Sequence, residues 1–326
     1  MKKAALILHG GCTSFDSDDT YALQHQAEQK SAMENILKKG WTLVESGESA
    51  LSVAEKVVNM LEDNPHFNAG IGAALNEQKE VELDASIMDG TSLSCGAVSG
   101  IKDYKNPVSI ARKVMTETQC VYLSEKGAQE FAKNGGFTKF PRKEFVTDYQ
   151  LHWWHIMRKS ESERQKRMKG TVGVVVLDVN GNISAATSTG GLTYKMKGRV
   201  GDSPLIGCGT YADSRFGGVS LTGYGEQIIK TALAKYTIDL IRFKKYTAQQ
   251  AAEESIRELS RLKNGKAGII TIDKNGTIGV YANEQFVNHA YMSSTMEQPF
   301  VGHTCQYNLQ NSRPTVTMYS YGRKKI

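Results

Sequence analysis

The stretch GTVGVVVLD, residues 170–178, decides how the chain is expected to fold. Valine is β-branched and packs well on a pleated sheet, so the run predicts a buried strand that begins at Thr171. Asn180-Gly181 follows and is typical of a type I′ hairpin turn, after which residues 183–188 would return as a second strand. The centre of the chain is therefore predicted to be an antiparallel hairpin.

The same device recurs nearer the C-terminus, where residues 269–273 and 277–281 flank Asn275-Gly276. Two helices are expected between the hairpins. One spans about 226–241, and the other starts at Thr247, with Gln250 completing a capping box, and stops at Asn264-Gly265. Antiparallel hairpins with helices packed outside predict a layered α/β sandwich, not a parallel βαβ sheet.

Upstream of residue 170, helical and extended patterns alternate. Apolar residues at helical spacing predict a helix capped by Ser49 that ends before Pro65. Residues 64–72 are rich in turn formers and predict a structured loop. The N-terminal apolar run ends in His9-Gly10-Gly11 and predicts a first strand running into a glycine turn. Further elements are expected as a strand at 81–88 and helices at 107–115 and 124–133.

Between residues 140 and 169 the periodic pattern is lost, and the last dozen residues are interpreted as a solvated linker. His152 and His155 could share one helix face as metal ligands. No further histidine or cysteine lies near them in sequence, so a partly exposed aromatic and basic face around Trp153-Trp154 is favoured.

The net charge of +6 is concentrated in two segments. Residues 158–169 and residues 303–326 each carry a net +4, which leaves −2 for the rest of the chain. A nucleic-acid groove within the fold is therefore not expected. The apolar runs are too short for a membrane span or a secretory signal, so we expect a cytoplasmic protein.

The sequence contains no well-supported motif for a metal, a dinucleotide or a common hydrolase site. The five cysteines are scattered and include no C-x-x-C, which argues against a disulfide framework or a zinc site. Residues 207–212 fit G-x-G-x-x-A, but the sequence that follows them cannot open a helix, so a dinucleotide site is not supported. No H-E-x-x-H, G-x-S-x-G or Walker A sequence occurs.

The junction between Gly170 and Thr171 has two interpretations. Threonine is common where strands begin, so the residue could be purely structural. Alternatively, the chain cuts itself here into residues 1–170 and 171–326. A threonine hydroxyl needs a nearby base to act as a nucleophile. The α-amine freed by the cut, with an ordinary pKa of about 7.7–8.0, is such a base.

Motifs along the chain resemble those of the plant-type asparaginase and isoaspartyl peptidase family, within the N-terminal-nucleophile (Ntn) hydrolases. The resemblance spans roughly residues 4–290. It rests on several spaced motifs that occur in the same order: HGG (9–11), FNAGIG (67–72), ELDA (82–85), MDG (88–90), GTVG (170–173), ATSTGG (186–191), KGRVGDSPLIG (197–207) and LTGYGE (221–226).

The resemblance implies catalytic roles for four residues. Thr171 would be the nucleophile and would form a covalent β-aspartyl ester with the substrate. Thr189 would position and polarise the nucleophile. Thr222 and the backbone N–H of Gly223 would form the oxyanion hole. No cofactor is implied for catalysis.

Substrate binding is implied for a second group. Arg199 and Asp202 would hold the free amino-acid end of the substrate, because a guanidinium pairs with an α-carboxylate and a carboxylate with an α-ammonium. Gly223 and Gly225 would lie against the substrate, and Asn68 would approach the nucleophile. The loop at 61–71 resembles a structural sodium site, with ligands from the backbone carbonyls of Leu61, Glu62, Asn64, Phe67, Ala69 and Ile71. His9-Gly10-Gly11 matches a mobile glycine loop near the scissile bond.

The expected protein is a single Ntn-hydrolase domain, a four-layer αββα sandwich, in which residues 140–169 form a flexible linker before the cut. The resemblance implies a homodimer of cleaved heterodimers. Its expected substrates are L-asparagine and β-aspartyl dipeptides. Two alternatives remain open: a glycosylasparaginase, and an uncleaved, non-catalytic binding protein on the same scaffold. The tail at 303–326 has no assigned function.

Overall fold

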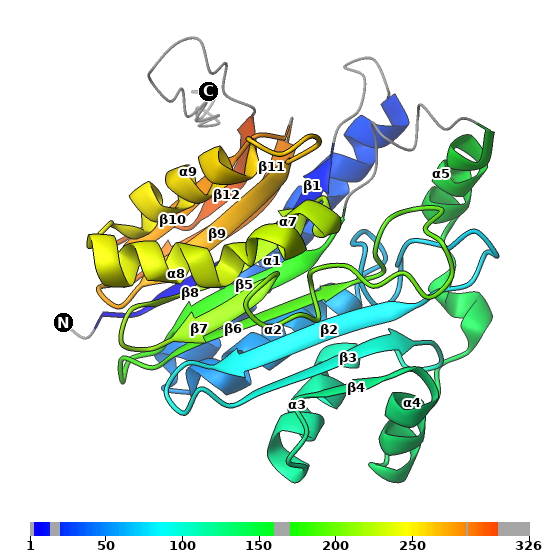
Figure 1. The fold of residues 1–326 in the computed structure, drawn as a ribbon, viewed down its shortest axis with the longest axis horizontal. Coiled ribbons are helices and arrows are strands. Elements are labelled where there is room, and N and C mark those ends of the chain that lie inside the picture. The colour runs from blue at the N-terminus through cyan, green and yellow to red at the C-terminus, as the bar shows by residue number, and fades with distance from the viewer. Residues whose placement is uncertain (1–2, 14–19, 160–169, 285, 306–326) are drawn as a thin grey trace, which may run out of the picture.

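Two β-sheets pack face to face between two groups of helices in the computed structural model (Figure 1). The structure describes residues 3–13, 20–159, 170–284 and 286–305. Residues 160–169, the last part of the linker expected at 140–169, and most of the basic tail lie outside these residues. Elements keep the labels of Figure 1.

The larger sheet has eight strands in the order β12-β11-β1-β5-β6-β2-β3-β4, and all neighbours are antiparallel except β3 and β4. The strand that begins after Thr171, β5, therefore lies near its centre. The bounds are β1 Ala5–Thr13, β2 Leu83–Asp89, β3 Cys95–Ile101, β4 Tyr122–Ser124, β5 Val172–Leu177, β6 Ile183–Thr189, β11 Phe286–Ser293 and β12 Phe300–Cys305.

The smaller sheet has four antiparallel strands in the order β10-β9-β8-β7. It packs on the larger sheet through contacts of β8 with β5, β9 with β1, and β7 with β6. The strand bounds are β7 Thr210–Asp213, β8 Gly217–Gly223, β9 Ala267–Asp273 and β10 Ile278–Ala282.

Helices cover the outer faces of both sheets (Figure 1). Helices α1, α2 and α3 pack on the larger sheet, and α8 and α9 pack on the smaller one. The bounds are α1 Thr20–Glu45, α2 Ala50–Glu62, α3 Pro107–Glu117, α4 Glu125–Asn134, α5 Asp148–Lys159, α7 Gly225–Thr231, α8 Leu233–Lys244 and α9 Ala248–Leu259, with a 3₁₀ turn at Arg142–Phe145.

Strand β5 shows why the central apolar run is continuous. Val174 and Val176 pack toward α1 and α2, whereas Val175 and Leu177 pack between the two sheets. Both faces of the strand are thus buried, which explains valines without polar alternation. The predicted layered sandwich is confirmed at the level of two sheets flanked by helices.

Both predicted helix caps are confirmed. The Ser49 side chain accepts a hydrogen bond from the Ser52 N–H at the start of α2. Thr247 and Gln250 form a complete capping box at the start of α9. Each cap satisfies backbone N–H groups that the first turn of a helix leaves unpaired.

The predicted type I′ turns are wrong in both hairpins. A type I′ turn needs positive φ at two central residues, but only Gly181 and Gly276 have it, at 86° and 80°. Asp178 and Asp273 are the cause. The side-chain Oδ1 of each accepts backbone N–H bonds two and four residues on, which favours a longer turn closed by glycine.

Three other predictions need correction. The linker predicted at 140–169 contains a 3₁₀ turn and helix α5, whose Trp153 and Trp154 are buried. The helix predicted at 226–241 is broken at Ala232, which is left-handed at φ 45° and separates α7 from α8. His9-Gly10-Gly11 lies within β1, with a register irregularity between His9 and Cys12, and is not a glycine turn.

Within the described part of the chain, no helix combines the length and the apolar character needed to cross a bilayer.

Candidate active site

Thr171 and Thr189 lie at the polar end of the seam between the sheets. The inward-facing residues of β5 and β6 are apolar at Val175 and Ala185 and end in these two threonines, both buried. Their hydroxyl oxygens are 3.2 Å apart. Both also lie close to the carbonyl oxygen of Gly170, at 2.7 Å for Thr171 and 2.9 Å for Thr189. The pairing of β5 with β6 therefore brings the predicted nucleophile and its predicted partner together.

Asn68 completes this group from the loop after α2. Its Nδ2 donates to the Gly170 carbonyl at 2.7 Å and to the Gly191 carbonyl at 2.7 Å. Its Oδ1 accepts from the Ala74 N–H at 2.6 Å, which fixes the amide orientation. The Gly170 carbonyl thus faces three donor groups, the Asn68 amide and the hydroxyls of Thr171 and Thr189. Donors placed in this way stabilise negative charge on a carbonyl oxygen.

Strand β1 packs against the same peptide. Gly11 has φ +101°, and a Cβ there would lie 3.0 Å from both Gly170 Cα and Thr171 N. Only glycine therefore fits at this position without a shift. His9 is fully buried, with Nε2 3.0 Å from Ser220 Oγ, and burial lowers its pKa to about 3. It is neutral near pH 7, in keeping with its having no assigned proton-transfer role.

Thr222 and Gly223 close β8, which faces β5 across the seam. The Thr222 hydroxyl accepts from the Cys12 N–H at 3.3 Å and donates to Cys12 Sγ at 3.6 Å. Gly223 has φ +158° and packs against Ala267. The structure thus places this predicted pair on the strand opposite Thr171.

Arg199 and Asp202 form a charged end of the site together with Glu226, the second residue of α7. Arg199 donates to Glu226 through Nε at 2.8 Å and Nη2 at 2.9 Å. A Cβ on Gly225 would lie 2.8 Å from Asp202 Oδ1 and 2.9 Å from Arg199 Nη2. Gly225 therefore lets the backbone approach both charged groups closely.

Asp202 is buried, and no described group bonds its Oδ2. Burial raises the pKa of this carboxyl to about 7, although the Arg199 charge acts in the opposite direction. A buried carboxylate with an unsatisfied oxygen is costly unless a cation or a donor reaches it. The position suits a ligand that brings an ammonium group.

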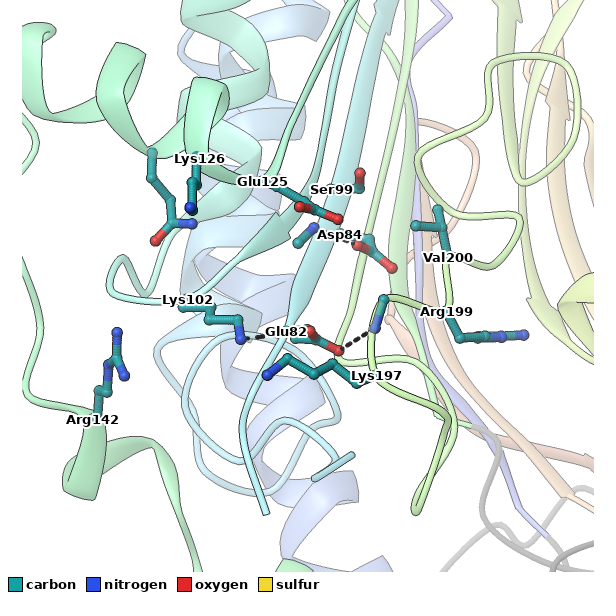
Figure 2. Close-up of a pocket in the computed structure, with 13 residues that line it drawn as sticks. Glu82, Asp84, Ser99, Lys102, Glu125, Lys126, Arg142, Lys197, Arg199 and Val200 are labelled. Carbon is teal, nitrogen blue, oxygen red and sulfur yellow. Dashed lines mark hydrogen bonds and ion pairs between the residues drawn. The ribbon is translucent and has the colours of Figure 1, made fainter. Parts of the chain in front are cut away.

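A cavity of about 530 Å³ lies next to Arg199 (Figure 2). Its lining includes Glu82, which precedes β2, Asp84 from β2, Lys102 and Lys197. Asp84 pairs directly with Thr189 in the sheet, so the cavity adjoins the threonine end of the site. The cavity thus borders the charged end of the site through Arg199, and neither Thr171 nor Thr189 lines it.

The chain is similar to known proteins over most of its length. A family model described as asparaginase matches residues 2–301. The isoaspartyl peptidase/L-asparaginase of Homo sapiens is 41% identical over 83% of this chain and 87% of its own length. The plant-type L-asparaginase of Pyrococcus furiosus is 38% identical over 91% and 99%, and the isoaspartyl peptidase of Escherichia coli 38% over 89% and 93%.

This chain belongs to the asparaginase family. The match contains every site residue predicted above and ends before the region that follows residue 305. The motifs from which the resemblance was drawn therefore led to the correct family.

Several residues near the predicted site were not singled out from the sequence. Glu226 is the partner of Arg199 but lies 27 positions away. Lys195 is buried, with its Nζ 4.0 Å from Asp84 Oδ2 and 3.0 Å from the Glu82 carbonyl. Burial raises the pKa of Asp84 and lowers that of Lys195. The alternation of Glu82 and Asp84 at the start of a strand was the one available signal, because it places both on one face.

The loop predicted to hold sodium turns sharply after α2. Gly70 and Gly72 have positive φ, and a Cβ on either would lie within 2.3 Å of the Glu62 or Pro65 carbonyl oxygen. These glycines let the loop fold its carbonyls inward after the C-terminus of α2, where the helix dipole favours a cation. Among the described residues, the carbonyls of Leu61, Glu62 and Asn64 each accept a backbone N–H bond, whereas no hydrogen bond reaches the carbonyls of Phe67, Ala69 and Ile71.

The Glu62 side chain has another role. It is fully buried, and its Oε1 accepts from Ser188 Oγ at 2.7 Å and from the Val108 N–H at 3.1 Å. Burial raises the pKa of this carboxyl to about 8. Glu62 thus joins α2 to β6 and α3 through its side chain and leaves only its carbonyl to the loop.

Proposed function

We propose that the protein is an autoprocessed amidohydrolase that cleaves the side-chain amide of L-asparagine and the isopeptide bond of β-aspartyl dipeptides. The observation that carries this proposal is the buried hydroxyl of Thr171, held beside Thr189 at the carbonyl of Gly170. Membership of the asparaginase family supports the same substrate class, because its relatives carry isoaspartyl peptidase and L-asparaginase names.

The first step is maturation of the chain. Thr171 Oγ1 attacks the carbonyl carbon of Gly170, and the bond from that carbon to Thr171 N breaks as the nitrogen takes a proton. Asn68 Nδ2 and the Thr189 hydroxyl stabilise the oxygen while it carries negative charge. Water then hydrolyses the ester, giving residues 1–170 and residues 171–326.

Turnover uses the new chain end. The freed α-amine of Thr171 takes the proton of its own hydroxyl, which attacks the side-chain carbonyl carbon of the substrate. Ammonia or an amino acid leaves with a proton, and water hydrolyses the remaining β-aspartyl ester. The Thr222 hydroxyl and the Gly223 N–H stabilise the tetrahedral oxygen.

Recognition of the substrate falls to the charged end. Arg199 binds the α-carboxylate, and the buried Asp202 accepts from the α-ammonium, which supplies the partner that its Oδ2 lacks. Glu226 holds the guanidinium until the substrate carboxylate replaces it. Gly225 leaves room for the ligand between the two charges.

The proposed fold type, assembly and sodium site follow from the resemblance to the same family. The fold is the four-layer αββα sandwich of Ntn hydrolases, and the working unit is a homodimer of cleaved heterodimers. The loop carbonyls of Leu61, Glu62, Asn64, Phe67, Ala69 and Ile71 hold a structural sodium ion. When bound, that ion neutralises converging carbonyl dipoles and stiffens the loop that carries Asn68.

Intact-mass spectrometry after incubation tests maturation. Wild type should give two pieces that meet at the 170/171 boundary, whereas Thr171→Ala should stay whole and inactive. Thr171→Ser keeps the hydroxyl and should still be cut. Substrate class is tested with isoaspartyl-leucine, asparagine and a glycosylated asparagine. Activity confined to the glycosylated substrate would contradict the substrate class, and full activity from an unbroken chain would contradict the mechanism.

A further inference from the structure

A second group of ligand side chains lies away from the Thr171 site. His25 and Glu28 come from α1, and His66 comes from the loop after α2. They share a pocket of about 260 Å³ with Tyr21 and Tyr149. No residue of this pocket belongs to the active site proposed above.

The three side chains can reach one ion. One ligand atom from each lies within 4.8 Å of the other two, and His66 Nδ1 is 3.3 Å from Glu28 Oε2. Ligands about 2.0–2.1 Å from a tetrahedral zinc ion are about 3.3 Å apart. One pair thus already has the required separation, and the ligand atom of His25 lies within 4.8 Å of both.

Neighbouring residues hold these side chains in place. The His25 ring stacks on Tyr149 at 3.5 Å between centroids and 7° between planes. Gln24 Nε2 donates to Glu28 Oε1 at 3.2 Å, leaving Oε2 toward His66. Gln29 Nε2 donates to the His66 carbonyl at 2.6 Å, which fixes the loop against α1. Outer contacts of this kind orient metal ligands.

The local charge also suits a cation. Glu28 is the only charged residue among those described as lining the pocket, and the others are aromatic, amide, hydroxyl, imidazole or proline groups. Two imidazoles with one carboxylate are a donor set that binds zinc and related divalent transition metals. Mg²⁺ and Ca²⁺ prefer oxygen ligands and fit this set poorly.

We propose that His25, Glu28 and His66 form a three-ligand site for a divalent transition metal of the zinc type. The fourth coordination position faces the pocket and is available to water or a small ligand. The bound metal fastens the first part of α1 to the loop at residue 66. Because it binds only the folded arrangement, it stabilises the native state.

Isothermal titration calorimetry with zinc chloride tests the site on full-length, untagged, chelator-treated protein. Wild type should bind one zinc ion per chain, and the melting temperature should rise with zinc. Glu28→Gln and His66→Asn alter partly exposed side chains. Each should weaken zinc binding by at least about tenfold. His155→Asn, at an exposed histidine of α5, is the matched control and should bind zinc as wild type does.

Three results would overturn the proposal: no zinc binding by folded wild type, equal binding by wild type and both ligand variants, or equal loss in His155→Asn. Equal binding by all variants would place the ion elsewhere on the chain. Visible absorption of the cobalt-substituted protein gives a second readout. Its bands should report imidazole and carboxylate ligands in wild type and change in His66→Asn. The outcome is independent of self-cleavage, which is scored separately by mass.

Discussion

The two ends of the active site are built from opposite kinds of side chain. Around the Gly170 carbonyl the groups are two hydroxyls and a carboxamide, from Thr171, Thr189 and Asn68. At the other end, the Arg199 and Glu226 ion pair lies beside the buried carboxyl of Asp202. None of the three side chains at the first end titrates near neutral pH. The first end therefore has no side chain that can act as the base, and the proposed mechanism uses the α-amine of Thr171 instead. At the second end, substrate binding should depend on pH through the Asp202 carboxyl.

The largest expected effect comes from a change at the Gly170 end of the site, and it is a slower self-cleavage. Asn68→Ala removes a donor at 2.7 Å from the Gly170 carbonyl, so the rate of cleavage should fall by about 10²–10³. The rate is followed by intact mass against time. Asn180→Ala, in the turn between β5 and β6, is the control and should be cut at the wild-type rate. An Asn68→Ala chain cut as fast as wild type would remove this residue from the cleavage site.

Arg199→Lys should affect the charged end and spare the other. Lysine keeps the charge but loses the two-bond geometry, so kcat/KM should fall by about 10²-fold, mainly through KM. Self-cleavage should be unchanged, because no described contact joins Arg199 to Gly170 or Thr171. Arg215→Lys alters a similar two-bond pair with Asp213, on an arginine that is 63% exposed, and serves as control. Slower cleavage in Arg199→Lys would mean that the two ends are coupled.

The smallest expected effect is on stability and its dependence on pH. The Asp202 carboxyl has a pKa of 3.8 when unfolded and about 7 when folded, so the folded state binds its proton more tightly. Its contribution to stability is complete below the lower value and is lost as pH rises through about 7. Asp202→Asn stays neutral. It should therefore raise the melting temperature by a few degrees at about pH 8 and by less at about pH 5, while abolishing substrate binding.

This pair of melts is measured in a Thr171→Ala background, so that both chains stay whole and unfolding is compared without a cut. Thermal melts followed by circular dichroism give the two temperatures. A gain that is equal at both pH values would mean that Asp202 does not carry the titration.

Local sequence patterns were enough to predict most helices and strands, but not the turns that connect them. Val174 and Val175 identify a strand buried on both faces, and Thr247 with Gln250 identifies a helix start. The turn type was missed because Asp178 captures backbone N–H groups, which outweighs the preference of Asn-Gly. Helix α5 was missed because its buried Trp153 and Trp154 are flanked by His152 and His155 and give no clear period.

Residues of the candidate site could be predicted where they lie close together in short sequence motifs. Arg199 and Asp202 lie three positions apart, and Thr189 follows directly on a predicted strand. Glu226 and Lys195 were not predicted, because their partners come from other elements and only the folded chain brings them together. The predicted role of Asn68 rested on the family resemblance alone, since nothing in the sequence of its loop indicates that the side-chain amide points at residue 170.

The strand order of the larger sheet has a consequence for how the protein would refold after cleavage. Strand β1 lies between β11 and β5, so a strand from before residue 170 is hydrogen-bonded on both edges to strands from after it. A chain cut at that point cannot come apart without dismantling its largest sheet. Once melted, it would have to find its other half by diffusion, and recovery would then depend on protein concentration. For a chain cut as proposed, folding is an intramolecular event only once, before the cut.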